Sequence, residues 1–317
     1  MCGLTGTEGV GCVLCGPVAR QVVAVKPPHT IVRCEGCGLC YAATRPTPVA
    51  MADFYDRYFA SRPETEYQHY RSGERWRRTV ARKRVRLLPR FVSKGRLLDH
   101  GCATGIFLRE AAEAGWEVLG VEASAAAREV VAREMPHVKV IEPNEMFVLP
   151  RRSLDAITMF DNFCYLHDPL GALRRFRTLL KPGGVILSIG ALDHAHAHRT
   201  PEPGITHTFY YAPGSVERLC KAAGLRLLVN TTCVKNANLP TRHPIAWAAS
   251  HVPGLRNLFF RQHFFVATTV EIPPEVAPEV LSETMADSNS DARADSSVAG
   301  VSSPASEASI RRGKERG

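Results

Sequence analysis

Two Cys-x-x-Cys pairs near the N-terminus carry the most specific chemical signal in this sequence. Cys12 and Cys15 form the first pair, and Cys34 and Cys37 form the second after 18 intervening residues. A glycine follows each pair directly, which suits the tight turn that points two sulfur atoms at one ion. Four thiolates at this spacing satisfy tetrahedral zinc, and so small a segment could scarcely fold without the ion. We predict a structural zinc site; redox-active pairs are the alternative.

A second stretch that could do chemistry spans residues 96–107. A short apolar run ends there in an acid, Asp99, and a turn follows that contains Gly101 and Gly105, with Ala103 in a position that needs a small residue. This pattern predicts a strand, a turn and a helix, in which the glycines let the backbone turn sharply and a ligand approach closely. By itself the pattern is also compatible with a tight turn that binds nothing.

Further motifs make this pattern more specific. Glu122 ends the next apolar run 21 residues after Gly101, where an acid can accept both hydroxyls of a ribose. Three more motifs follow in order: Leu154–Phe160, Asp168–Pro169 and Leu179–Gly184. In order and spacing, these features resemble class I S-adenosylmethionine-dependent methyltransferases over roughly residues 93 to 270.

The resemblance implies S-adenosylmethionine as the cofactor. In that family the glycine turn cradles the methionine end of the cofactor, and the acid before the turn, here Asp99, orients its ammonium group. Glu122 would hold the ribose hydroxyls, and Glu145 would lie near the adenine amino group. The cofactor-binding candidates are therefore Asp99, Gly101, Ala103, Gly105, Glu122, Glu145 and Asp161.

The catalytic residues are predicted on the acceptor side of the site. Because the sulfonium is already a good leaving group, the protein mainly has to hold the reactants in line, but a hydroxyl or carbon nucleophile also needs a base. Many relatives carry Glu-His after the fourth strand, where this chain has Cys164 and Tyr165. His207 follows the fifth strand, on the side where open α/β sheets bind ligands. We predict His207 and Tyr165 as catalytic candidates; a histidine that only packs its segment is the alternative.

Strands and helices must alternate to position these residues. We expect an α/β fold with a Rossmann-like, seven-stranded, mostly parallel sheet that has an antiparallel edge strand, plus a small N-terminal zinc ribbon. The expected strands lie near 96–99, 117–122, 138–141, 154–160 and 185–189, with an edge pair near 225–232 and 262–270. The expected domains are a zinc ribbon at 1–45, a helical connector with a basic helix at 46–92, a methyltransferase domain at 93–270 and a disordered tail at 271–317.

The connector combines positive charge with aromatic side chains. Residues 71–90 contain nine Arg or Lys and one Glu, within a chain of net charge +9. Such a run can meet an anionic substrate or nucleic acid, or it can be a solvated helix face. The aromatic cluster before it can be core or a substrate box, and consists of Phe54, Tyr55, Tyr58 and Phe59. The order of paired cysteines, Pro-x-Pro and this cluster resembles zinc-ribbon methyltransferases, which include sugar C-methyltransferases.

Together these features predict a methyltransferase that acts on oxygen or carbon of a small-molecule acceptor, with a sugar or a nucleotide-linked compound as a candidate. An RNA methyltransferase that grips phosphates with the ribbon and the Arg-rich helix is less favoured, and a non-catalytic adaptor that keeps the fold is the alternative from another class. A nicotinamide oxidoreductase would leave the Leu-Lys-Pro-Gly-Gly segment and the ribbon unexplained. No signal segment or membrane span is expected, and cysteines that do not form a disulfide framework fit a cytoplasmic location.

Overall fold

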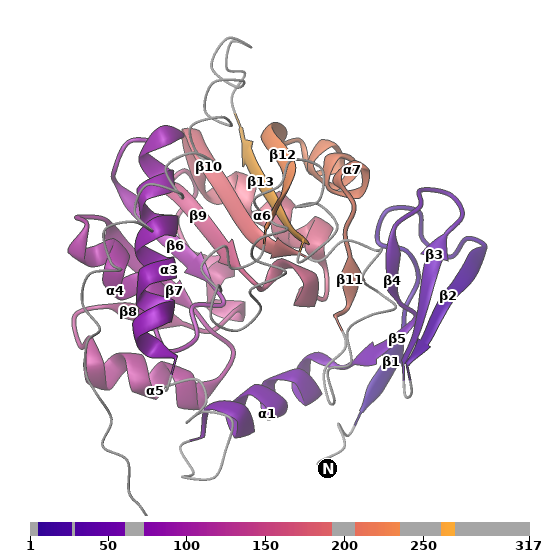
Figure 1. The fold of residues 1–317 in the computed structure, drawn as a ribbon, viewed down its shortest axis with the longest axis horizontal. Coiled ribbons are helices and arrows are strands. Elements are labelled where there is room, and N and C mark those ends of the chain that lie inside the picture. The colour runs from indigo at the N-terminus through magenta and orange to yellow at the C-terminus, as the bar shows by residue number, and fades with distance from the viewer. Residues whose placement is uncertain (1–5, 27–28, 61–72, 192–206, 235–260, 270–317) are drawn as a thin grey trace, which may run out of the picture.

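The computed structural model (Figure 1) describes residues 6–26, 29–60, 73–191, 207–234 and 261–269. The tail predicted for residues 271–317 lies outside the described residues. No helix in the described part of the chain is long and apolar enough to cross a membrane.

A seven-stranded sheet forms the centre of the molecule, in the order β12-β13-β10-β9-β6-β7-β8. Neighbours from β10 to β8 are parallel, whereas β13 is antiparallel to both β10 and β12. This confirms the predicted α/β fold, with the detail that β13 lies one place inside the edge strand. The strands are β6 (Arg96–His100), β7 (Glu117–Val121), β8 (Lys139–Ile141), β9 (Leu154–Phe160), β10 (Leu180–Ala191), β12 (Arg226–Val234) and β13 (Arg261–Thr268).

The strand β10 begins earlier than the sequence pattern indicates. Leu180 already pairs with Leu154 of β9, and the register then shifts before Val185. The Lys-Pro-Gly-Gly segment is the irregularity inside this strand, with Gly183 at φ +78°.

Helices cover both faces of the sheet because alternate residues along each strand point to opposite faces. Leu97 packs with side chains of α3 and α4 on one face, whereas Leu98 packs with side chains of α6 and α7 on the other. The helices are α1 (Pro48–Phe59), α3 (Glu74–Leu87), α4 (Ile106–Glu113), α5 (Ala125–Glu134), α6 (Pro169–Leu179) and α7 (Pro213–Ala223), with short 3₁₀ turns η1 (Leu88–Arg90), η2 (Asn144–Val148) and η3 (Phe163–Tyr165).

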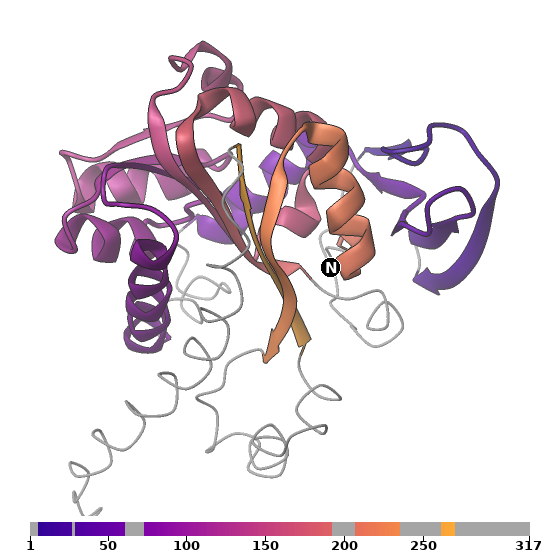
Figure 2. The same cartoon turned by 90° about the horizontal axis from the view of Figure 1, so that it is seen from above.

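The N-terminal strands form two small sheets beside α7, opposite α3 (Figure 2). One sheet pairs β1 (Thr7–Gly9) with β5 (Thr44–Pro46). The other has the order β11-β4-β3-β2, and its strands are β2 (Arg20–Lys26), β3 (His29–Cys34), β4 (Cys40–Ala42) and β11 (Phe209–Tyr210). Since β11 follows the fifth parallel strand by sequence, the catalytic part of the chain contributes one strand to this sheet.

We call the part of the chain up to Pro46 that forms these two small sheets the ribbon. The ribbon and the central sheet share one hydrophobic core. Leu39 and Tyr41 of the ribbon belong to the same cluster of buried side chains as Phe163, Phe209 and Tyr211. The ring of Phe163 stacks on that of Tyr211 with centroids 4.5 Å apart. Buried side chains from both sides of the boundary predicted at residue 45 therefore pack in one cluster.

We predict that Leu39→Ala destabilises the catalytic part as well as the ribbon. Loss of this fully buried side chain should lower the free energy of unfolding by about 2–5 kcal/mol. All three tryptophans lie beyond residue 46, so their fluorescence during urea unfolding reports on the chain outside the ribbon. Val25→Ala, at an exposed position of β2, should change stability by less than about 0.5 kcal/mol. A tryptophan transition that Leu39→Ala leaves in place would contradict the shared core.

Candidate functional site

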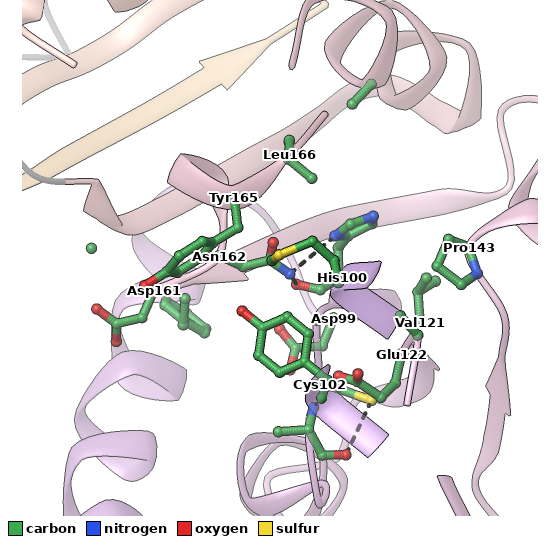
Figure 3. Close-up of a pocket in the computed structure, with 18 of the residues that line it drawn as sticks. Asp99, His100, Cys102, Val121, Glu122, Pro143, Asp161, Asn162, Tyr165 and Leu166 are labelled. Carbon is green, nitrogen blue, oxygen red and sulfur yellow. Dashed lines mark hydrogen bonds between the residues drawn. The ribbon is translucent and has the colours of Figure 1, made fainter. Parts of the chain in front are cut away.

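A cavity of about 1200 Å³ opens at the carboxyl ends of the parallel strands (Figure 3). It lies where β6 and β9 are neighbours and the strand order reverses, which is where open α/β sheets bind ligands. Residues that end β6, β7 and β9 line its floor, and side chains of α1 and α3 line its wall. Among the described residues, this cavity gathers most of the side chains that the sequence singles out.

The glycine turn after β6 has the predicted backbone, for a reason that differs at each position. Gly101 and Gly105 have φ of +77° and +78°. A Cβ at Gly101 would overlap the side-chain amide of Asn162, and one at Gly105 would overlap Met135. Gly101 therefore makes room for a neighbouring side chain rather than for a ligand alone, and Gly105 lets α5 pack closely.

Ala103 takes a left-handed conformation, with φ +49°. This costs about 1–2 kcal/mol for a residue with a Cβ. Its N–H donates to Glu122 Oε2 at 2.9 Å, and a hydrogen bond to a carboxylate can offset that strain. The small-residue position of the turn is thus tied directly to the acid that ends β7.

Glu122 is buried and held at both oxygens. Its Oε1 accepts the N–H of Ser124 at 2.9 Å, while Oε2 accepts that of Ala103. Burial raises the pKa of Glu122, and these two hydrogen bonds act against the rise. The hydroxyl of Ser124 donates to Asp56 Oδ1 at 2.7 Å, which docks α1 over the turn.

Asp99 ends β6 at the floor of the cavity. Its side chain accepts a hydrogen bond of 2.7 Å from the hydroxyl of Thr158 on β9. Burial raises the pKa of Asp99 to about 7, and the bond from Thr158 opposes this effect. A carboxyl group desolvated in this way favours a cationic ligand, because a positive charge nearby stabilises its ionised form.

Asp161 and Glu145 occupy different surroundings. Asp161 lines the cavity and forms an ion pair of 2.9 Å with Arg84 of α3. Glu145 does not line the cavity: its carboxylate accepts the N–H of Glu142 at 2.8 Å and closes the turn that leads into η2. Glu142, together with Asn144, lines the wall at this point instead.

The structure brings the two catalytic candidates together. The hydroxyl of Tyr165 lies 3.2 Å from His207 Nε2, and their rings stack with centroids 4.9 Å apart. Both side chains line the cavity, and His207 is buried. Sequence reasoning proposed each residue separately, from the fourth and fifth strands, and only the fold shows that they form a pair.

Two further polar residues at the site were missed in the sequence. Asn162 donates to the carbonyl oxygen of His100 at 3.0 Å and fills the space above Gly101. His167 lines the cavity, and its Nε2–H donates to Pro46 O at 2.9 Å. Both residues lie between the end of β9 and the start of α6 at Asp168–Pro169, and this position in the sequence could have indicated them.

Three of the four aromatic side chains of α1 line the cavity and also belong to a small hydrophobic cluster with Ala127. Tyr55, Tyr58 and Phe59 lie on its wall, with Trp76 of α3 beside them. Tyr55 and Tyr58 also pack against the small side chain of Ala103. The connector therefore covers the glycine turn with aromatic surface.

Three arginines of the basic helix α3 form ion pairs with acids. Arg78 and Arg82 both bind the carboxylate of Glu110, which is buried on α4. Arg84 binds Asp161, and its guanidinium also lies 4.4 Å from the ring centroid of Phe160. These contacts support a packed helix more than a surface prepared for phosphates.

The four predicted cysteines converge in the ribbon. Their sulfur atoms all lie within 4.8 Å of one another, and Cys12 and Cys37 are 3.5 Å apart at Sγ. Tetrahedral zinc, with bonds of about 2.3 Å, would need sulfurs about 3.8 Å apart. The glycines after the pairs, Gly16 and Gly38, have φ of +71° and +75° and make the expected tight turns. The donor set and the geometry therefore fit a tetrahedral ion.

Comparison with known families decides the class of the chain. Residues 67–229, about half of the chain, match the model of a family described as a methyltransferase domain. The chain belongs to this family. It is also 22% identical over 99 residues to an uncharacterized methyltransferase of Oceanobacillus iheyensis, and the match covers 30% of this chain and 46% of that protein. The chain therefore spans about half the length of this curated relative.

Solved structures resemble this chain at low sequence identity. A chain in the complex between the Haloferax volcanii Trm112 methyltransferase activator and a methyltransferase is 15% identical with a TM-score of 0.51, over 67% of this chain and all of that one. An S-adenosylmethionine-dependent methyltransferase of Thermotoga maritima is 18% identical with a TM-score of 0.48, over 69% of this chain and all of that one. The likeness to the first of these, with a TM-score above 0.5, concerns the fold alone.

We predict that Gly101→Ala damages the methyltransferase domain more than Gly183→Ala does. Both glycines have nearly the same φ, but a Cβ at Gly183 meets no atom within 4 Å. Gly183→Ala should cost only the left-handed strain of about 1–2 kcal/mol. Gly101→Ala adds overpacking against Asn162 and should cost about 2–5 kcal/mol in total. If thermal or urea unfolding gave equal losses of stability for the two variants, the side-chain amide of Asn162 would be able to move aside at little cost.

Proposed function

We propose that this protein is a class I S-adenosylmethionine-dependent methyltransferase that transfers a methyl group to oxygen or carbon of a small-molecule acceptor. The observation that carries the proposal is the composition of the cavity. Acids and the glycine turn at the ends of β6 and β7 line one part of it, and the pair of His207 and Tyr165 lines another.

The cofactor would lie over the glycine turn. Asp99 suits the methionine ammonium, since a cation there would stabilise its buried carboxylate. Glu122 would accept the ribose hydroxyls, from a carboxylate whose position is set by two backbone N–H groups. Gly101, Ala103 and Gly105 would form the cradle, and Asp161 would border it through its ion pair with Arg84. Glu145 would act through the turn that it closes, because Glu142 and Asn144 line the wall.

The acceptor would be deprotonated by the His207–Tyr165 pair. Bound S-adenosylmethionine supplies an electrophilic methyl group on a sulfonium, and the protein has to align the nucleophile with it. Nε2 of His207 would take the proton once the acceptor displaces the hydroxyl of Tyr165 from it, and the stacked ring of Tyr165 would orient the imidazole. Tyr55, Tyr58 and Trp76 would exclude water from this step.

A small molecule is favoured over RNA by the wall of the cavity. Its aromatic side chains come from α1 and α3, and the arginines of α3 that face α4 are already bound to Glu110. A sugar or nucleotide-linked acceptor would stack on this surface. An RNA substrate would instead reveal itself by binding that weakens steeply with salt.

Calorimetry tests the cofactor proposal. S-adenosylmethionine should bind to the purified protein, and NADH should not. Glu122→Ala should weaken S-adenosylmethionine binding about 10- to 150-fold, since a charge-assisted hydrogen bond contributes about 1.5–3 kcal/mol. Glu129→Ala, at an exposed acid of α5 outside the cavity wall, is the control and should retain the parental affinity. Parental affinity in Glu122→Ala would refute the assignment of the ribose site.

Turnover tests the proposed base. His207→Ala should lower the rate of methyl transfer by about 10²- to 10⁴-fold while S-adenosylmethionine binds with nearly parental affinity. Tyr165→Phe keeps the stacked ring but removes the hydroxyl, so a smaller loss is expected. The measurement is transfer of labelled methyl groups to a panel of sugars and nucleotide-linked sugars. If His207→Ala methylates the acceptor at the parental rate, the histidine has only a packing role.

We also propose that Cys12, Cys15, Cys34 and Cys37 hold one structural zinc ion. Burial raises the pKa of the Cys12 and Cys37 thiols to about 11, so a bound cation is needed to keep them as thiolates at neutral pH. Cys34→Ser should reduce the zinc content from one equivalent per chain and destabilise the ribbon. Cys40→Ser changes a buried cysteine outside the cluster and should retain the metal. Full zinc content in Cys34→Ser would remove this proposal.

A further inference from the structure

We propose that the ribbon positions the acceptor side of the active site: strands β4 and β5 hold the two segments that carry Tyr165 and His207. The roles of these two side chains rest on the function proposed above. The positioning itself rests on contacts between the ribbon and the segments, and it gives the ribbon a task in the reaction beyond stabilising the chain.

Thr208 is the point where the ribbon and both segments meet. Its carbonyl oxygen accepts the N–H of Ala42 in β4 at 2.9 Å. Its own N–H and its hydroxyl both donate to the carbonyl oxygen of Cys164, each at 2.9 Å. Because His207 precedes Thr208 and Tyr165 follows Cys164, these bonds fix the backbone beside both catalytic candidates.

The strand after Thr208 extends this attachment. β11 pairs antiparallel with β4, where Phe209 faces Tyr41 and Tyr210 faces Cys40. Within the described strands β11 has no pairing with the seven-stranded sheet, since it belongs to the four-stranded sheet of the ribbon. The segment of His207 is therefore built onto the ribbon and not onto the sheet that holds the cofactor crevice.

Arg45 of β5 holds the other segment from the far end. Its Nη1 donates to the carbonyl oxygen of His167 at 2.6 Å, and its Nε forms an ion pair of 2.7 Å with Glu8 of β1. The next residue, Pro46, accepts a hydrogen bond of 2.9 Å from Nε2 of His167. The segment from Cys164 to His167 is thus bonded to the ribbon directly at one end and through Thr208 at the other.

The cysteine cluster lies close in sequence to these contacts. β4 begins three residues after Cys37, and the N–H of Cys34 donates to Leu39 O at 2.9 Å just before that strand. Arg218 of α7 donates to the carbonyl oxygen of Cys37. Since α7 follows β11, this bond attaches the turn around Cys37 to the chain that follows the segment of His207.

Histidine NMR on the ligand-free, zinc-loaded chain tests this inference without any acceptor. The imidazole nitrogen signals of His167 and His207 would be assigned from His167→Gln and His207→Gln variants. Arg45→Gln removes the donor to His167 O and should shift both sets of signals, while the affinity for S-adenosylmethionine stays within about twofold of parental. Glu8→Gln breaks the same ion pair but leaves Arg45 able to donate to His167 O, so the signals should stay in place.

Two outcomes would overturn the inference. Signals that coincide with the parental ones in Arg45→Gln would show that the ribbon does not set these positions. Equal shifts in Arg45→Gln and Glu8→Gln would show a general disturbance of the ribbon instead. Arg45→Lys keeps one donor and serves as the second variant should Arg45→Gln fail to fold; it should give smaller shifts, and parental signals there count against the inference. Because these signals do not depend on catalysis, failure of the turnover test would leave this result interpretable.

Discussion

The backbone of Thr208 is the constraint on which the arrangement of the site depends. Its carbonyl oxygen accepts a hydrogen bond from the ribbon and its N–H donates one to the segment after β9, so this residue joins the two. Thr208 is buried, and a buried backbone N–H or C=O without a hydrogen-bond partner costs free energy. The packed structure therefore favours these bonds. They bring together three parts of the chain that are far apart in sequence, and the pair of Tyr165 and His207 results from that meeting.

The cofactor side of the cavity is organised differently, by buried charge. Asp99 and Glu122 lie at the ends of adjacent strands, and each is held by hydrogen bonds from the protein. Burial raises the pKa of both groups, so their surroundings favour a ligand that brings positive charge or hydroxyl donors. Rigid strands thus present the groups proposed for the cofactor, while the groups proposed for the acceptor lie on connecting segments.

Helix α1 is joined to the glycine turn by a short chain of hydrogen bonds. The carboxylate of Asp56 accepts a hydrogen bond from the hydroxyl of Ser124, and the N–H of Ser124 donates to one oxygen of Glu122. The other oxygen of Glu122 accepts the N–H of Ala103. The same helix lines the cavity with Tyr55 and Tyr58. The connector between the ribbon and the sheet therefore lines the cavity. Its helix α1 is held, through Ser124, by the same carboxylate that would bind the ribose.

Local patterns in the sequence determined the strands, the glycine turn and the four-cysteine cluster. Each depends on short-range rules: apolar runs that end in acids, glycines where φ is positive, and paired cysteines before a turn. Such rules act within a few residues, so the sequence predicted β6, β7 and β9 to within about two residues. It also singled out Tyr165 and His207, each from its place after a strand.

Only the tertiary structure decided which distant groups meet. The contact between Tyr165 and His207, the filling of the space above Gly101 by Asn162 and the addition of β11 to the ribbon sheet all join residues more than 40 positions apart. The charges of α3 were visible in the sequence, but their neutralisation by Glu110 was not. The physical reason is that these contacts follow from how the layers pack, and packing depends on the whole chain at once rather than on any short stretch of it.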